Sequence, residues 1–247
     1  MNKNINKNEN WELFIKKAEE FNINLTAKQI EQFQKYWQFL YEYNKHTNLV
    51  SSAELDLVAS KHFADSLSIG LLENELSLNS SKTVLDIGIG GGFPGVPIII
   101  AYPDLKLYAV DSVGKKTDFI SKLSEELGLN DRIEVINSRA EELIKQPNKQ
   151  EFFDIAVSRA VSRLNILLEY TLPFVKVGGF FIAYKAKTFQ EEINDSKQAL
   201  SILGGEVIEI ANYTLSNEER KLILIKKIRP TPEKYPRKTG IPAKNPL

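Results

Sequence analysis

The sequence TVLDIGIGGGFPGVPIIIA occupies residues 83–101, and the rest of the chain is organised around it. A β-rich run over residues 83–87 meets a loop with glycines at positions 88, 90, 91, 92 and 95. The apolar run that follows is long enough for a helix. The pattern predicts a strand, a glycine-rich loop and a helix.

Glycine permits positive φ angles and lets backbone N–H groups approach a ligand, so this density of glycine after a strand indicates a nucleotide-type site. If the helix begins at Pro94, then Pro94 and Pro97 fall within its first four positions, where backbone N–H groups have no intrahelical partner to lose. The positive end of the helix dipole would then point at the ligand. A tight strand-to-helix turn without a ligand is the structural alternative.

The dinucleotide pattern G-x-G-x-x-G matches only from Gly90, with Pro94 inside it. When the pattern is placed at Gly88, Phe93 stands where the third glycine should be. Asp86, two residues before the first glycine, suits S-adenosylmethionine, whose amino-acid end is cationic at the ammonium and sulfonium groups. The stretch therefore resembles the first motif of Rossmann-type methyltransferases, and NAD is the main alternative ligand.

Composition limits the class of protein. The 247 residues, 43% of them hydrophobic, suffice for one large α/β domain with an appendage. The absence of cysteine excludes disulfides, thiolate metal sites and cysteine nucleophiles. The N-terminus MNKNINKNEN has no apolar signal region, and no apolar run reaches the length of a membrane span, so we expect a cytoplasmic protein without membrane contact. The net charge is zero and gives no argument for nucleic acid by itself.

Residues 1–75 are predicted to form an N-terminal helical cap. After a polar tail over residues 1–9, apolar residues keep helical spacing from Trp11 to Phe21. Thr26 and Gln29 match a capping box that opens a second helix. A third helical stretch is expected over residues 55–72.

Strands and helices alternate over residues 76–228, which predicts a mostly parallel sheet with helices on both faces. A polar loop rather than a helix joins the last two strands, so these two should be antiparallel. Seven strands with the last one reversed is typical of Rossmann-like class I methyltransferases, whereas dehydrogenase domains normally have six parallel strands. The expected strands are 83–87, 106–110, 132–136, 153–158, 179–184, 205–210 and 220–227, and the expected helices are 93–101, 114–127, 139–145, 162–172 and 188–202.

Residues that follow the strands are the candidates for ligand contact, because ligands of such sheets lie across the carboxyl ends of the strands. Asp111, 23 residues past Gly88, is placed to accept hydrogen bonds from ribose hydroxyls. Capping the helix from Gly114 is a compatible role for Asp111. Residues 138–142 (SRAEE) are expected at an adenine edge, and residues 158–160 (SRA) and 184–187 (YKAK) follow the next two strands.

Several chemistries are excluded by absent residues. Methylation of pyrimidine C5 needs a cysteine nucleophile, and the Asp/Asn-Pro-Pro-aromatic motif for exocyclic amines is replaced by residues 158–160. Only His46 and His62 could offer imidazole to a metal, so we expect no metal site and interpret both as local hydrogen-bonding residues. A methyl acceptor that needs no strong base remains, and guanine N7 is one.

Seven segments together resemble the glucose-inhibited division protein B family. They are NKHTNL (44–49), HFADSL (62–67), DIGIGGGFPG (86–95), DSVGKK (111–116), SRAEE (138–142), FDIAVSRAV (153–161) and KYPRKTGIPAKNPL (234–247). The resemblance implies a bacterial enzyme that transfers the methyl group of S-adenosylmethionine to N7 of a guanine in 16S rRNA, in the decoding-region loop of the small subunit.

The resemblance also implies which residues contact the cofactor, with Arg159 at the reaction centre as the candidate catalytic residue. The chain departs from the usual family pattern at Ile89, Lys116 and Ala186, and the first departure puts a side-chain hydrogen bond of the loop in doubt. We expect a monomer. The contacts implied by the resemblance are Gly88, Phe93, Ala140, Glu141 and Arg159, and the loop and strand arguments above add Asp86, Gly90 and Asp111.

Residues 229–247 form a basic, proline-rich tail. Between residues 226 and 247 there are seven basic residues and one acid, and the prolines favour an extended chain that suits a phosphate backbone. A solubilising tail is the alternative. The predicted RNA-binding residues are Lys115, Lys185, Lys234, Arg237 and Lys238.

Two other functions remain open at this level. One is an RNA- or ribosome-binding module with a vestigial cofactor pocket, and the other is an NAD-dependent oxidoreductase. Binding of S-adenosylmethionine separates both from the methyltransferase, whose partner would be 16S rRNA or the small ribosomal subunit.

Overall fold

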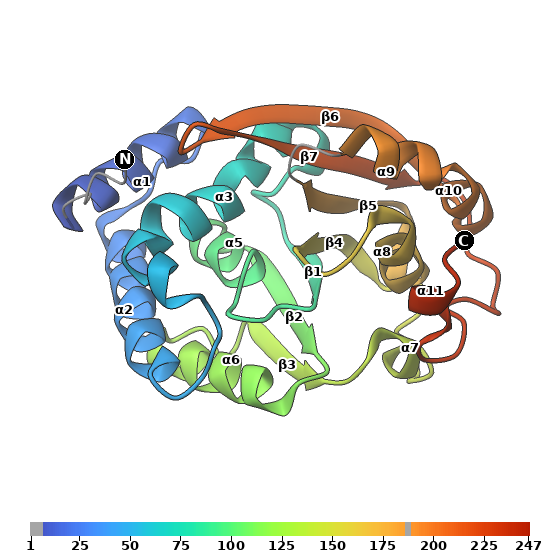
Figure 1. The fold of residues 1–247 in the computed structure, drawn as a ribbon, viewed down its shortest axis with the longest axis horizontal. Helices are drawn as coiled ribbons and strands as arrows, with labels where there is room; N and C mark the ends of the chain where they lie inside the picture. The colour runs from blue at the N-terminus through green and yellow to red at the C-terminus, as the bar shows by residue number, and fades with distance from the viewer. Residues whose placement is uncertain (1–6, 186–188) are drawn as a thin grey trace.

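A computed structural model describes residues 7–185 and 189–247. A seven-stranded sheet in the order β3-β2-β1-β4-β5-β7-β6 runs through its centre, with helices on both faces (Figure 1). Neighbouring strands from β3 to β5 are parallel, and β7 is antiparallel to β5 and β6, which confirms the predicted sheet. The strands are β1 (Lys82–Ile87), β2 (Leu105–Asp111), β3 (Ile133–Asn137), β4 (Phe153–Arg159), β5 (Val175–Lys185), β6 (Gly205–Leu215) and β7 (Glu218–Lys227).

The last two strands are longer than predicted. The polar stretch expected to be a loop over residues 212–220 continues both strands, and only Ser216 and Asn217 remain in the turn. Both have positive φ angles, 50° and 64°, which is the backbone of a two-residue hairpin whose twist matches its strands. Alternation of polar and apolar residues in this stretch therefore reflects a strand with one exposed face.

The helices between the strands lie close to their predicted positions. The helix expected over 188–202 is divided in two at Ser196, whose hydroxyl bonds back to the Glu192 carbonyl (2.6 Å) and competes with the helical ladder. Residues 186–188, including Ala186 and the start of this helix, lie outside the described residues. The helices are α5 (Gly95–Ala101), α6 (Gly114–Glu126), α7 (Ala140–Leu143), α8 (Leu164–Thr171), α9 (Phe189–Asp195) and α10 (Lys197–Leu203), with a 3₁₀ turn η4 (Leu172–Phe174).

The cap begins with α1 (Lys7–Glu20) and α2 (Ala27–Asn44). The predicted capping box is present, since Thr26 Oγ1 accepts from the Gln29 N–H (3.3 Å) and the Thr26 N–H donates to Gln29 Oε1 (2.8 Å). Gln29 Nε2 also donates to the carbonyls of Ile100 (2.8 Å) and Ala101 (2.9 Å) at the end of α5. The Gln29 side chain thus caps the N-terminus of α2 and also bonds the helical cap to the sheet domain.

The helical stretch expected over residues 55–72 is confirmed, but it is a series of short helical turns of different pitch rather than one regular α-helix. Within it, the hydroxyls of Ser66 and Ser68 bond to the carbonyls of His62 (2.7 Å) and Asp65 (2.7 Å). A π turn in the middle is a feature often found at functional sites. These turns are η1 (Ser52–Leu57), η2 (Ala59–Phe63), α3 (Ala64–Leu67), η3 (Ser68–Leu72) and α4 (Glu73–Leu76).

The apolar core has one part on each face of the sheet. Phe14, Phe33 and Phe63 of the cap share one cluster with α5, α6 and strand residues such as Val84, so the cap and the sheet domain have a common core. The other cluster lies beneath α7, α8 and α10. Each helix of the described residues is too short or too polar to cross a membrane.

The C-terminal segment packs against the body more closely than the expected extended tail. Tyr235 is buried in the second cluster, and a short helix, α11 (Ile241–Lys244), follows beside α7 and α8 (Figure 1). Lys227 is fully buried, where its Nζ donates to the Leu172 carbonyl (2.6 Å). The seven basic residues between positions 226 and 247 therefore do not form a continuous exposed surface.

Candidate active site

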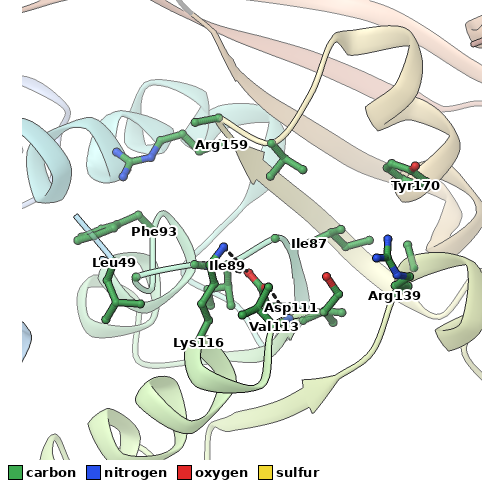
Figure 2. Close-up of a pocket in the computed structure, with 18 of the residues that line it drawn as sticks. Leu49, Ile87, Ile89, Phe93, Asp111, Val113, Lys116, Arg139, Arg159 and Tyr170 are labelled. Atoms are coloured by element: carbon green, nitrogen blue, oxygen red, sulfur yellow. Dashed lines mark hydrogen bonds and ion pairs between the residues drawn. The ribbon is translucent and has the colours of Figure 1, made fainter. Parts of the chain in front are cut away.

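A pocket of about 560 Å³ opens at the carboxyl ends of β1 to β4, where a doubly wound sheet binds its ligand. In Figure 2, Phe93 and Arg159 lie at one end, Arg139 and Tyr170 lie at the opposite end, and Asp111 lies between them. The volume is within the roughly 300–1,000 Å³ usual for small-molecule sites. Seven residues predicted to bind cofactor line this pocket: Gly88, Gly90, Phe93, Asp111, Ala140, Glu141 and Arg159.

The glycine loop leads from β1 into α5. A Cβ atom on Gly88 would lie 2.5 Å from Cγ2 of Val161, and a Cβ atom on Gly92 would overlap the Tyr36 hydroxyl. Both glycines have positive φ angles, 78° and 98°, which L side chains rarely adopt. The loop therefore needs glycine for its backbone conformation and for the close approach of its neighbours.

Asp86 lies beneath this loop and does not line the pocket, contrary to the cofactor contact predicted for it. The side chain is fully buried, and Oδ2 accepts a hydrogen bond from the Gly95 N–H (2.8 Å). Oδ1 has no hydrogen-bond partner within the described part of the chain. Burial raises the pKa of Asp86 to about 7, against the opposing effects of the Gly95 hydrogen bond and the Arg159 charge. Asp86 therefore supports the glycine loop from its buried side. The N–H of Gly95, the first residue of α5, bonds to Asp86 and is not free to bind a ligand.

Asp111 ends β2 and faces the loop. Oδ2 accepts from the Gly90 N–H (3.1 Å) and Oδ1 from the Val113 N–H (3.0 Å), while Nζ of Lys116 lies 3.6 Å from Oδ2. The N-cap of α6 is Val113, so the interpretation of Asp111 as that cap is wrong. A carboxylate offers about four acceptor positions, and the two in use leave capacity for ribose hydroxyls.

Arg159 ends β4, and the cap holds its guanidinium in place. Nη1 donates to Oδ2 of Asp65 (2.9 Å), and Nη2 lies 3.1 Å from Nδ1 of His62. The guanidinium carbon lies 4.9 Å from the centre of the Phe93 ring. The hydroxyl of Tyr213 donates to Oδ1 of Asp65 (2.7 Å). Because both oxygens of the buried Asp65 have donors, the orientation of Arg159 is well defined.

His62 continues this line of contacts toward the cap. Arginine can only donate, so Nδ1 of His62 accepts, and the neutral ring carries its proton on Nε2. Burial, and then the charge of Arg159, lower the pKa of His62 to about 4. Nε2 lies 3.7 Å from Oε2 of Glu54, which also lines the pocket. His62 is thus a neutral hydrogen-bonding residue, which agrees with the interpretation from sequence.

The opposite end of the pocket is built on α7 and α8. Glu141 Oε1 accepts from the N–H of Gly240 (3.2 Å), and Glu142 Oε1 accepts from the hydroxyl of Thr239 (3.1 Å). The C-terminal segment therefore packs directly against the helix that carries the expected adenine contacts.

Two of the cations predicted to bind RNA are engaged within the fold. Lys185 Nζ lies 2.7 Å from Oε2 of Glu192, and its side chain is only 10% exposed. Arg237 forms an ion pair (2.6 Å) with the fully buried carboxylate of Glu169. A phosphate would have to compete with these carboxylates, so RNA contact by Lys185 and Arg237 is not what the geometry favours. Lys115, Lys234 and Lys238 are exposed.

Sequence reasoning assigned no role to Asp65, Glu54 or Tyr170, and it gave His62 a hydrogen-bonding role without placing it at the site. His62 and Asp65 have a spacing of three, which places both on one helical face, and this signal was available in HFADSL. Glu54 and Tyr170 carry no comparable local signal. Their positions depend on how the cap and α8 pack onto the sheet.

The sheet order and the pocket at the strand ends define a Rossmann-like methyltransferase fold. The structure resembles a SAM-dependent methyltransferase from Aquifex aeolicus, with a TM-score of 0.51 and 17% identity over 75% of this chain and 97% of that one. It also resembles the geranyl diphosphate C-methyltransferase of Streptomyces coelicolor A3(2), solved with S-adenosyl-L-homocysteine, with a TM-score of 0.53 and 14% identity over 82% and 98%. Both likenesses confirm the predicted fold class.

Residues 29–223 match the family described as rRNA small subunit methyltransferase G. Over 237 residues the chain is 45% identical to the ribosomal RNA small subunit methyltransferase G of Acetivibrio thermocellus, which covers 95% of this chain and 96% of that protein. It is 42% identical over 238 residues to the protein of the same name from Lactococcus lactis subsp. lactis, covering 95% and 98%. The chain belongs to this family, which is the glucose-inhibited division protein B (GidB) family that its seven sequence segments resemble.

Proposed function

We propose that this protein transfers a methyl group from S-adenosylmethionine to N7 of a guanine in the 16S rRNA of the small ribosomal subunit. The observation that carries the proposal is the convergence of seven predicted contact residues, from the ends of four strands, on one pocket. Relatives named as small-subunit rRNA methyltransferases support the class of substrate.

The pocket suits an elongated cofactor with a ribose in its middle. Asp111 stands halfway along it with acceptor capacity to spare, and the glycine loop runs beside it. Ala140 and Glu141 stand at the far end, where the adenine would lie. The methyl-bearing end of the cofactor would then face Phe93 and Arg159.

When bound, S-adenosylmethionine supplies an electrophilic methyl group on a sulfonium centre. Guanine N7 has a lone pair available, so the chain needs to orient the base and exclude water rather than supply a strong base. Bidentate pairing of an arginine with guanine uses O6 and N7 together and would block the acceptor. Arg159, whose guanidinium is already bound by Asp65 and His62, therefore contacts at most O6, the cofactor or a phosphate.

An rRNA substrate implies that the protein acts in the cytoplasm, on free 16S rRNA or on the small subunit. The test is to map N7-methylguanine in 16S rRNA from a deletion strain and from its parent, by primer extension or mass spectrometry. Loss of one methylated guanine in the deletion strain, restored by the intact gene, is the expected result. Unchanged methylation, with calorimetric binding of NAD and not of S-adenosylmethionine, would favour an oxidoreductase. Absence of cofactor binding with retained rRNA binding would favour an RNA-binding module.

A further inference from the structure

The helical cap forms one wall of the pocket, and none of the proposed cofactor contacts lies on this wall. Those contacts come from the strand ends and the loops that follow them, whereas this wall comes from the segment between α2 and α3. Leu49 of this wall lies at the same end as Phe93 and Arg159 (Figure 2). A methyl acceptor must reach this end, so the wall is available to the acceptor base. Its residues are Leu49, Val50, Ser51, Glu54 and His62.

Glu54 is the anionic side chain of this wall, and its neighbours hold it in place. Ser51 Oγ donates to Oε2 (3.1 Å), Nζ of Lys61 lies 3.2 Å from Oε1, and His62 Nε2 lies 3.7 Å from Oε2. Burial alone would raise the pKa of Glu54, but the hydrogen bond from Lys61 and the other neighbours hold it below its ordinary value. The carboxylate is therefore ionised at neutral pH, and the Glu54 side chain is 36% exposed and lines the pocket.

An ionised carboxylate with two hydrogen bonds has acceptor positions left and has no proton to donate. Among the four RNA bases, guanine alone presents two adjacent donors on its Watson–Crick edge, N1–H and the exocyclic N2 amino group. Enzymes that modify a base commonly hold it by hydrogen bonds to this edge. N7 lies on another edge of the purine, so a guanine bound in this way keeps N7 free.

We propose that Glu54 binds the Watson–Crick edge of the target guanine, selects that base and directs N7 toward the methyl donor. The inference rests on the proposed function and deepens it. His62 lies between Arg159 and this carboxylate: Nη2 of Arg159 lies 3.1 Å from its Nδ1, and its buried Nε2, which has no hydrogen-bond partner among the described residues, lies 3.7 Å from Oε2 of Glu54.

The same contact favours the reaction itself. Transfer forms a bond between N7 and carbon and breaks the bond between carbon and sulfur, whose electron pair stays on sulfur, so positive charge passes to the purine. That charge makes N1–H a stronger donor. A carboxylate at this edge therefore binds the transition state more tightly than the ground state, which raises kcat.

The test compares the full-length wild type with Glu54→Gln on small subunits that carry either guanine or inosine at the mapped target position. Inosine keeps N1–H and N7 but lacks the N2 amino group. Glu42→Gln is the matched control, because Glu42 is also a glutamate of the cap but pairs with Lys45 on the exposed surface of α2. Melting temperature and S-adenosylmethionine affinity show whether each variant is folded.

We expect the wild type to lose about tenfold or more in kcat/KM on inosine, the factor typical of a lost hydrogen bond to a charged group. Glu54→Gln should lose at least as much on guanine and should discriminate less between the two bases, with unchanged cofactor affinity. Glu42→Gln should match the wild type. Equal wild-type rates on guanine and inosine, or an unchanged ratio in Glu54→Gln, would overturn the assignment while the methyltransferase function stands. No guanine methylation by the wild type would overturn both.

Discussion

The guanidinium of Arg159 lies 4.9 Å above the ring of Phe93, so the residue that ends β4 rests on the last residue of the glycine loop before its prolines. Tyr36 of α2 also stacks on Phe93, with ring centroids 5.6 Å apart. Cap, loop and sheet thus meet at one ring. Substitutions in the cap, the loop or the end of β4 should therefore alter the end of the pocket that Phe93 and Arg159 line.

Replacing Arg159 with alanine should reduce turnover by at least tenfold, which corresponds to about 1.4 kcal/mol of lost transition-state stabilisation. The physical reason is that Arg159 lines the end of the pocket where the methyl group is transferred. Single-turnover kinetics measure this loss. Arg163→Ala is a suitable control, since Arg163 forms an exposed ion pair with Asp195. Wild-type turnover in Arg159→Ala would remove this residue from the site.

Tyr213→Phe should destabilise the protein by about 1–3 kcal/mol, because the change leaves one oxygen of a buried, charged Asp65 without its donor. Urea unfolding measures the difference. Activity should fall as well, since Asp65 holds Arg159. Tyr41→Phe, an exposed position on α2, serves as the control. Equal stability of Tyr213→Phe and wild type would mean that Asp65 does not depend on this bond.

Gly88→Arg should abolish binding of S-adenosylmethionine, because a side chain there collides with Val161 and cannot keep a φ of 78° without strain. Gly128→Arg provides a matched control, with a similar φ of 63° and open space around its Cβ position. Calorimetry should show binding by the control and none by Gly88→Arg. Normal binding by Gly88→Arg would place the cofactor elsewhere.

The cost of burying Asp86 should appear as a pH dependence of stability. Its folded pKa of about 7 lies above its unfolded value, so the folded state binds more protons between roughly pH 4 and 7. The contribution of this residue to stability is therefore present below about pH 4 and is lost as the pH rises to 7. Asp86→Asn keeps an acceptor for Gly95 and removes the titration. Urea unfolding at pH 5 and 8 should show the variant gaining on the wild type at the higher pH, whereas parallel profiles would contradict the raised pKa.

The C-terminal cations should separate into two groups. Replacing the exposed Lys234 and Lys238 with alanine should flatten the salt dependence of rRNA binding by roughly 0.7–0.9 units of slope per lost phosphate contact, without changing cofactor affinity. Arg237→Ala should instead weaken cofactor binding and stability, since it leaves the buried Glu169 without its ion pair beside α7 and the pocket. An unaltered salt slope in the double variant would make these lysines solubilising residues only.

The sequence was sufficient to predict the sheet, its reversed last strand and seven residues that line one pocket, because periodicity, the glycine loop and positions after strands are local signals. Asp86 was assigned to the ligand from its place before the first glycine and the positive charge of the expected cofactor, whereas it is fully buried and accepts from the N–H of Gly95. RNA binding by Arg237 stays a prediction, which its ion pair with the buried Glu169 does not favour. Glu54 could not be predicted, because its place in the pocket depends on how the cap docks onto the sheet.

Transfer of labelled methyl groups in vitro tests the central claim most directly. Small subunits from the deletion strain are incubated with the purified protein and labelled S-adenosylmethionine, and the modified nucleotide is identified after digestion of the 16S rRNA. The account predicts N7-methylguanosine at one position with the wild type and none with Gly88→Arg. Label in another nucleotide or in protein, or no incorporation by a folded wild type that binds the cofactor, would contradict it.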